Sequence, residues 1–211
     1  MLVTNKLFDI EYNTYRQLQI KLREKRKEVL IFLEHSATIT AGKNFQPENL
    51  LVTENYLFEN KIDFYSVERG GDLTAHEKGQ LVIYPHIDLQ KRNLTIGKFL
   101  QILNSSLTES IEEVWNLEVY SHPEKAGIYL KKDPEKKILS QGVYFKSFFT
   151  SYGIAMNLKN DLKLFQLIHP CGGESKNIVS IQSLGLDISL EKKFILEFTK
   201  RFLDRISNAV G

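Results

Sequence analysis

The sequence predicts an α+β fold in which a mixed β-sheet is flanked by helices. Segments with helical hydrophobic periodicity stand near the start, the middle and the end of the chain, with groups of short β-type segments between them. Several strands follow one another without an intervening helix, which is unlike the regular alternation of a βαβ fold. Hydrophobic residues make up 42% of the 211 residues, which is enough for one sizeable core. We therefore expect one domain spanning residues 1–211.

The first half of the chain predicts one helix and three strands. Residues 12–27 form an amphipathic pattern with a charged end, which indicates a helix. Residues 29–33 are a short apolar run of β-forming residues bounded by charges, which is typical of a buried strand. Residues 62–67 and 81–84 predict two further strands, and Pro85 is expected to end the second one.

A long amphipathic helix is predicted next, with Thr95 as its N-cap. Apolar side chains recur at helical spacing after this threonine: Ile96, Phe99, Leu100, Leu103, Leu107, Ile111 and Val114. Residues 126–130 and 138–144 then predict paired strands around a polar turn in which Asp-Pro marks the reversal.

The end of the chain predicts one more strand and one more helix. Side chains alternate with small residues from Tyr152 to Leu158, as they do in strands. Ser189 is the expected cap of the last helix. The apolar face of this helix consists of Phe194, Ile195, Phe198, Phe202 and Ile206.

Charge and cysteine content narrow the functional classes. The formal net charge is only +2, so the overall charge gives no indication of a nucleic-acid partner. No uncharged apolar run approaches the ~20 residues that span a bilayer, and the N-terminal residues do not resemble a signal peptide. One cysteine permits no intramolecular disulfide. We therefore expect a cytoplasmic protein with a reduced thiol and no membrane association.

Basic residues form two local runs. The first contains Lys21, Arg23, Lys25, Arg26 and Lys27, and the second contains Lys131, Lys132, Lys136 and Lys137. Such runs are usually solvated faces. The sharper interpretation is that they dock an acidic partner.

Paired glycines mark the first candidate site segment, which reads Arg69-Gly70-Gly71-Asp72-Leu73-Thr74-Ala75-His76. Glycines without a Cβ allow a ligand to approach the backbone closely, and their N–H groups can point at an anion or a carbonyl oxygen. A tight turn between two strands would explain the same residues. The segment has neither the Rossmann nor the P-loop spacing, so it requires no nucleotide cofactor.

Two further segments carry groups that could react. Lys137, before Ile138-Leu139-Ser140-Gln141-Gly142, is either an exposed residue leaving a charged turn or a lysine turned inward as a usable base. Cys171 stands between Pro170 and Gly172-Gly173, which indicates a loop, where a thiol can be accessible and reactive, although a free cysteine can equally be a small buried residue. The five histidines are scattered, so a metal site is weakly supported.

Taken together and in order, these segments resemble the lipoyl(octanoyl) transferase family. The resemblance runs from about Glu34-His35-Ser36 to Ser183-Leu184 and includes Ser151-Tyr152-Gly153-Ile154-Ala155-Met156-Asn157. It implies the mixed-sheet catalytic domain shared by biotin and lipoate protein ligases. It also implies transfer of an octanoyl group from octanoyl-acyl carrier protein to a lysine of a lipoyl domain. The implied acceptors are the E2 subunits of 2-oxoacid dehydrogenases or the glycine cleavage H protein.

The resemblance implies a role for each matching residue. Cys171 stands where the family has its acyl-accepting cysteine, and Lys137 stands where it has its catalytic lysine. The implied acyl pocket is lined by residues Arg69 to His76, by Ser140, Gln141 and Gly142, and by Gly153, Ile154 and Ala155. The chain departs from the family where Glu77-Lys78 replaces Gly-Pro and where Tyr152 replaces histidine. Both departures are expected near the pocket, where they would affect chain-length preference.

The chemistry explains why these residue types are needed. A thiolate exchanges one thioester for another at little free-energy cost, and attack by a lysine amine then gives an amide without ATP. An ammonium beside the cysteine favours its thiolate. Two alternatives stay open at this point. One is an ATP-dependent lipoate or biotin ligase of the same fold, and the other is a non-catalytic module that binds an acyl carrier.

Overall fold

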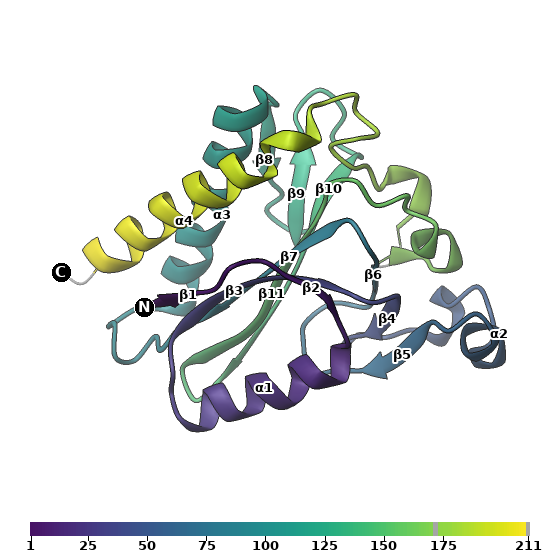
Figure 1. Cartoon of the computed structure of the whole chain (residues 1–211), viewed down its shortest axis with the longest axis horizontal. Coiled ribbons are helices and arrows are strands. Elements are labelled where there is room, and N and C mark those ends of the chain that lie inside the picture. Colours follow the sequence, from purple (N-terminus) through teal and green to yellow (C-terminus); the bar gives the residue numbers. More distant parts are fainter. Residues whose placement is uncertain (171–172, 210–211) are drawn as a thin grey trace.

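The computed structural model describes residues 1–170 and 173–209 of the chain. A large eight-stranded sheet has the order β1-β3-β7-β11-β10-β9-β8, with β2 beside β3, and a small sheet has the order β5-β4-β6 (Figure 1). The strands are β1 (Leu2–Val3), β2 (Leu7–Ile10), β3 (Val29–His35), β4 (Thr38–Ala41), β5 (Asp63–Ser66), β6 (Leu73–His76), β7 (Gln80–His86), β8 (Val119–Ser121), β9 (Gly127–Leu130), β10 (Lys137–Lys146) and β11 (Phe149–Asn157).

Helices lie on both faces of the large sheet. Figure 1 shows α3 and α4 together on one face and α1 on the other, while α2 lies beside the small sheet. The α-helices are α1 (Tyr12–Glu24), α2 (Glu54–Glu59), α3 (Ile96–Trp115) and α4 (Glu191–Asn208). The short 3-10 turns are η1 (Pro47–Asn49), η2 (Leu164–Leu167), η4 (Ser175–Asn177) and η5 (Ile188–Leu190). The prediction of a mixed sheet with flanking helices is therefore confirmed.

Apolar side chains form three buried clusters that follow these layers. The largest packs the large sheet against α3 and α4, and Phe99, Phe198 and Phe202 in it are fully buried. The second lies under α1 and is rich in tyrosine. The third fills the space between the small sheet and residues 162–168. Because both faces of the large sheet are covered, every residue of β3 is buried.

Most predicted elements are present. The Thr95 hydroxyl accepts a hydrogen bond from the Lys98 N–H (3.1 Å) and caps α3 as predicted. Strands β9 and β10 pair in antiparallel fashion around the predicted turn, and β11 continues the ladder beside β10. The first helix ends at Glu24, three residues earlier than predicted, and Arg26 then takes a left-handed φ of 46°.

The prediction that Pro85 ends its strand is wrong, because β7 continues through Pro85 to His86. Pairing of β7 with β3 includes Leu30↔Pro85, whereas pairing of β7 with β11 stops at Ile83↔Ile154. The proline therefore lies where β7 has lost its backbone ladder to β11, so its missing N–H breaks no ladder bond there.

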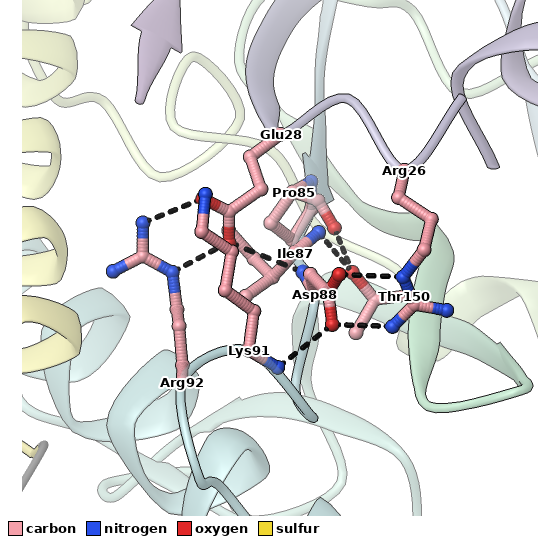
Figure 2. Close-up of polar contacts among 8 residues, drawn as sticks. All are labelled: Arg26, Glu28, Pro85, Ile87, Asp88, Lys91, Arg92 and Thr150. Atoms are coloured by element: carbon pink, nitrogen blue, oxygen red, sulfur yellow. Dashed lines mark hydrogen bonds and ion pairs between the residues drawn. The ribbon is translucent and has the colours of Figure 1, made fainter.

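Beyond Ile83, the Thr150 side chain replaces the backbone hydrogen bonds between β7 and β11. The Thr150 hydroxyl donates to the Pro85 carbonyl and accepts from the Ile87 N–H (2.8 Å), and the Thr150 N–H donates to the Ile87 carbonyl (3.0 Å). Figure 2 shows dashed lines from the Thr150 hydroxyl to Pro85 and to Ile87. This hydroxyl holds β7 and β11 together where their backbone pairing is interrupted.

Ion pairs close the same end of the sheet (Figure 2). Arg26, after α1, pairs with Asp88, after β7, through two guanidinium nitrogens. Arg92 pairs with Glu28 in the same two-point way, and the Asp88 N–H donates to Glu28 (3.2 Å). The connection from α1 to β3 is thus tied to the connection from β7 to α3.

Two other features differ from the sequence-based expectations. Ser189 does not cap α4, because it lies within η5, where its own N–H donates to the Asp187 carboxylate (2.8 Å). The α4 helix begins directly after this turn with no side-chain cap. The small sheet was predicted only in its β5 strand, because β4 and β6 are four-residue segments without an apolar run.

We expect Thr150→Val to lower the free energy of unfolding by about 1–3 kcal/mol, because the shape is kept while the Ile87 N–H loses its buried acceptor. Denaturant unfolding monitored by circular dichroism measures the change. The matched control is Thr108→Val on α3, whose hydroxyl donates only to helix carbonyls. Equal effects of the two substitutions would contradict the role given to Thr150.

Candidate active site

A pocket lies between the large sheet and the segment that contains the paired glycines. Strands β10 and β11 form one wall, residues of β6 and the preceding loop form the opposite wall, and α1 and β7 contribute tyrosines. The lining residues are Tyr12, Arg69, Gly70, Gly71, Leu73, Thr74, His76, Tyr84, Ala126, Lys137, Ser140, Gln141, Gly142, Tyr152, Gly153, Ile154, Ala155 and Pro170.

The structure brings most of the sequence-predicted site residues together in this pocket. Two members of the Arg69-to-His76 segment are absent from its lining. The Asp72 carboxylate instead accepts hydrogen bonds from the Gln46 N–H (3.2 Å) and the Asn49 amide. Ala75 is fully buried in the core of the small sheet. Asp72 and Ala75 thus lie behind the lining residues, and their predicted contact with substrate stays a prediction.

Two glycines allow close approach in the wall formed by β10 and β11. Gly142 and Gly153 are paired across β10 and β11. A Cβ on Gly153 would lie 2.3 Å from the Ile83 carbonyl oxygen, and a Cβ on Gly142 would lie 2.9 Å from Arg69 Cδ. Contacts this short do not occur between real atoms, so a side chain at either position would displace its neighbours.

The Arg69 guanidinium is engaged within the protein. It donates to the Thr40 carbonyl (2.7 Å) and to the Thr40 hydroxyl (2.8 Å), and its Nη1 donates to the Gly70 carbonyl (2.9 Å). Because the side chain is 6% exposed, these bonds compensate for the removal of the charge from water. Arg69 thus fixes the glycine loop to β4.

Lys137 is the first residue of β10, and its side chain lies inside the protein. It is 8% exposed, lines the pocket, and places its Nζ 5.5 Å from the centre of the Tyr129 ring. Of the two interpretations of this lysine, the inward one is correct. The Lys137 carbonyl accepts from the Val179 N–H (3.0 Å), so the start of β10 is joined to the segment after residue 173.

Cys171, the predicted nucleophile, lies outside the described residues. The described residues near it in the chain are anchored beside the pocket. Pro170 lines the pocket and accepts from the Gly173 N–H (3.0 Å), and the His169 N–H donates to the Asn49 carbonyl (2.8 Å). Before them, Ile168 forms an antiparallel bridge with Leu50.

A second cleft adjoins the pocket on this side. It shares Lys137 and Pro170 with the pocket and extends over Tyr129, Asn177 and Ile178. A third cleft shares Gly70 and Gly142 with the pocket and extends over Leu100 and Phe145. The pocket therefore has surface grooves on two sides.

Sequence reasoning missed the aromatic part of the pocket. Tyr12 and Tyr84 both line it, although one comes from α1 and the other from β7. They were assigned only to a helix and a strand, because no short-range motif marks side chains that meet through tertiary packing. The hydroxyls of Tyr12 and Thr74 have no hydrogen-bond partner among residues 1–170 and 173–209.

Three histidines are buried in the same part of the protein: His35 and His76 contact Tyr12, and His86 contacts Tyr15. Removal from water lowers the pKa of His35 and of His86 to about 4, and the pKa of His76 to about 3, with His35 as the second cause for His76. Their ring nitrogens contact uncharged groups, such as the Tyr84 hydroxyl at 3.0 Å from His35 and the Gln80 amide oxygen at 2.9 Å from His76. All three are neutral at pH 7.

Tyr152 and Glu77-Lys78, where the chain departs from the family pattern, lie in different parts of the structure. Tyr152 lines the pocket with a left-handed φ of 57°, and its hydroxyl donates to Glu68 (2.8 Å). Burial, together with this carboxylate, raises the pKa of Tyr152 to about 12. Glu77 points away from the pocket and accepts from Asn160 Nδ2 (3.0 Å) and from the Leu162 N–H (3.0 Å). Glu77 and Lys78 follow His76, which lines the pocket, but they themselves line a separate surface groove.

Several residues of the two basic runs form ion pairs or hydrogen bonds within the protein. Arg26 pairs with Asp88, Lys131 with Glu112, and Lys136 donates to the Lys176 carbonyl. Lys137 is inside the pocket wall. Of the other members of the runs, Arg23 is half-buried and Lys21, Lys25, Lys27 and Lys132 are exposed.

The structure describes residues 1–170 and 173–209. Within this part of the chain no group of three His, Cys, Asp or Glu side chains is arranged to hold a metal ion. None of the helices in it is long and apolar enough to cross a membrane.

Comparisons with known proteins give a consistent picture. Residues 9–203 match the model of the lipoyl protein ligase A/B catalytic domain. An octanoyltransferase of Leptospira interrogans is 50% identical over 184 residues, which are 87% of this chain and 85% of that protein. An octanoyltransferase of Koribacter versatilis is 34% identical over 191 residues, covering 87% of this chain and 76% of that protein.

Solved structures share the fold at low sequence identity. Lipoate-protein ligase A bound with ATP superposes with a TM-score of 0.65 at 19% identity, covering 99% of this chain and 85% of that one. The biotin protein ligase from Aquifex aeolicus has a TM-score of 0.59 at 14% identity, covering 99% and 72%. These structures support the predicted ligase-type fold.

We expect the free energy of unfolding to decrease as the pH falls from about 7 to about 5. The unfolded chain takes up protons on histidines near their ordinary pKa of 6.5, whereas the folded chain keeps His35, His76 and His86 neutral until about pH 4 or below. Each contributes at most about 1.4 kcal/mol per pH unit. Urea unfolding across this range measures the slope.

The matched variants are His35→Gln and His169→Gln. The first removes a buried titrating group and should reduce the slope, while the second changes an exposed histidine and serves as the control. An unchanged slope in His35→Gln would show that burial of this ring does not contribute to the pH dependence.

Proposed function

We propose a mechanism for this chain, which belongs to the lipoyl protein ligase A/B catalytic-domain family and is an octanoyltransferase of lipoate biosynthesis. In this mechanism the octanoyl group is held as a thioester on Cys171, and Lys137 is the acid–base partner. The observation that carries this proposal is the position of Lys137. Its side chain is buried in the pocket wall, and its carbonyl is bonded to Val179 in the segment that follows Cys171. An inward lysine joined to that segment is suited to exchange protons with a nucleophile carried by it.

In the first step, the Cys171 thiolate attacks the carbonyl carbon of the octanoyl thioester on the acyl carrier protein. A new carbon–sulfur bond forms, and the bond to the phosphopantetheine sulfur breaks. The Lys137 amine takes the proton from the Cys171 thiol and returns it to the departing thiolate. The products are the octanoyl-enzyme and the free carrier thiol, so no ATP is consumed and no cofactor is required.

In the second step, the amine of the acceptor lysine attacks the octanoyl-enzyme. The incoming lysine is an ammonium at neutral pH and is inert until it loses a proton, which Lys137 accepts. The amide bond forms as the carbon–sulfur bond to Cys171 breaks. Of the two protons that the incoming ammonium loses, Lys137 passes one to the leaving Cys171 sulfur, and the other is released to water. This restores the free enzyme for another cycle.

The pocket composition supports an acyl chain as its occupant. Ser140, Gly142, Gly153 and Ala155 give β10 and β11 a surface of small residues, with Leu73 on the opposite wall. Such a slot suits an unbranched apolar chain, because burying each methylene group contributes about 0.8 kcal/mol. The N–H groups of Gly70 and Gly71 are available as candidates for polarising the acyl oxygen.

The proposed partners are octanoyl-acyl carrier protein as donor and lipoyl domains of 2-oxoacid dehydrogenase E2 subunits or of the glycine cleavage H protein as acceptors. Carrier proteins are typically acidic, so Lys21, Lys25 and Lys27, which are exposed, are candidate docking residues. In this proposal residues 1–211 form one catalytic domain. It also places the reaction in the cytoplasm, where a single free thiol stays reduced.

We expect the mass of the intact protein to increase by one octanoyl group after mixing with octanoyl-acyl carrier protein. Cys171→Ala should show no increase while keeping its fold, which circular dichroism would check. The thioester should be cleaved by hydroxylamine. An adduct of equal yield on Cys171→Ala would contradict the proposed nucleophile.

Mass analysis after reaction with lipoate and ATP, in addition to the octanoyl carrier, distinguishes the transferase from the two alternative functions. A ligase would form lipoyl-adenylate from lipoate and ATP without Cys171, and a non-catalytic module would bind the carrier without an adduct. Repeating the reaction with added salt tests the basic docking residues, because screening should slow association with an acidic carrier.

We expect Lys137→Ala to lower the transfer rate by about 100- to 10,000-fold, the usual range for loss of a general base. Lys137→Arg should not restore activity, because a guanidinium does not give up its proton near neutral pH. The rate of octanoyl transfer at saturating carrier measures both. Lys136→Ala is the matched control one residue earlier, where the amine donates to the Lys176 carbonyl. Substantial activity in Lys137→Arg would exclude proton transfer by this residue.

A further inference from the structure

The side chain of Lys137 lies where Gly127 has no side chain. A Cβ added to Gly127 would lie 2.4 Å from Lys137 Cε and 3.2 Å from its Nζ. The same Cβ would lie 2.4 Å from the Leu139 carbonyl oxygen, and Gly127 has a φ of 143°, which residues with a side chain rarely adopt. The position of the lysine amine therefore depends on a glycine in the neighbouring strand.

The pairing of β9 with β10 explains this contact. Lys137 is opposite Tyr129, but Leu139 is opposite Ile128, so the register shifts between Lys137 and Leu139. Irregularities of this kind change the direction of a side chain relative to a regular ladder. The shift accompanies the passage of the Lys137 methylene chain over Gly127.

Tyr129 forms a second contact surface for the amine. The Lys137 Nζ is 5.5 Å from the centre of the Tyr129 ring, within the range of a cation–π interaction. Gly127 and Tyr129 are two residues apart on β9, so their side-chain positions are on the same face of the strand. Gly127 leaves room for the methylenes, and the Tyr129 ring contacts the charged end.

We propose that β9 positions the Lys137 amine at the pocket, with Gly127 as a positioning residue that admits the lysine chain and the Tyr129 ring as a second support. Neither residue touches the reacting atoms. The catalytic consequence rests on the proposed function, since it requires Lys137 to transfer protons, whereas the positioning itself does not.

A side chain at residue 127 should displace the amine. The far end of the lysine is flexible and moves readily, whereas the Leu139 carbonyl is held in the sheet, so relieving that second contact also requires a local shift of β9 relative to β10. Displacement by about 1 Å is enough to lower a rate by about 100-fold when geometry is critical. We therefore expect Gly127→Ala to reduce the rate of octanoyl transfer by about 10- to 100-fold, with little change in the KM for the carrier.

The experiment compares Gly127→Ala with Gly185→Ala. Gly185 also has a positive φ, 72°, but a Cβ there would have no atom within 4 Å, so this control adds a side chain at a positive φ without a contact. Each protein is treated briefly with acetic anhydride, and acetylation of individual lysines is followed by peptide mass spectrometry. Lys6, whose side chain is 9% exposed, reports on loosening of the fold as a whole.

The expected result is faster acetylation of Lys137 in Gly127→Ala alone, with Lys6 unchanged. Equal Lys137 acetylation in wild type and Gly127→Ala would overturn the positioning role, whatever the activity. Faster acetylation with an unchanged transfer rate would support the positioning role and instead count against the proposed proton transfer by Lys137.

A second pair of variants covers the case in which Gly127→Ala does not fold. Tyr129→Leu removes the ring, and Tyr129→Phe keeps it. We expect Lys137 acetylation to rise and the transfer rate to fall more in the leucine variant than in the phenylalanine variant. Equal values in the two would exclude the ring as a support for the amine.

Discussion

Burial of the Lys137 amine in the pocket wall is the constraint on which the arrangement of the site depends. An ammonium removed from water is costly unless neighbouring groups compensate for the lost hydration. The protein supplies a fixed backbone at the start of β10, through the bond from Val179, and an aromatic ring from β9. Close approach also requires a glycine at residue 127. These features have no evident purpose for an ordinary surface lysine.

The two sheets share the construction of the pocket. The large sheet provides a wall of small residues on β10 and β11, and the small sheet provides the opposite wall through β6. Arg69 connects them, because it lines the pocket while its guanidinium is bonded to Thr40 of β4. Helices α3 and α4 cover the opposite face of the large sheet (Figure 1), and Ile154 belongs both to the core beneath them and to the pocket lining.

Sequence reasoning predicted the elements and much of the pocket, because periodicity, caps and paired glycines are local signals. It placed Lys137, Gly142 and Gly153 in one site through a family resemblance, and the pocket contains all three. Sequence reasoning was wrong where tertiary contacts determine the course of a strand or the position of a side chain. Pro85 continues a strand because Thr150 replaces the interrupted ladder, and Tyr12 reaches the pocket only because α1 packs on the sheet. Glu77, where the chain departs from the family pattern, accepts hydrogen bonds from the 160–164 segment.

The order of strands in the large sheet has a consequence for biosynthesis. Strand β11 lies between β7 and β10 and pairs Ile83 with Ile154, although these residues are far apart in the chain. While the ribosome is still synthesising residues before Phe149, β7 has an unpaired edge and the pocket lacks an entire wall. Long-range strand pairing of this kind is slow compared with local contacts. The nascent chain is therefore exposed to misassociation until its last third has emerged, and this is when a chaperone would be of most use.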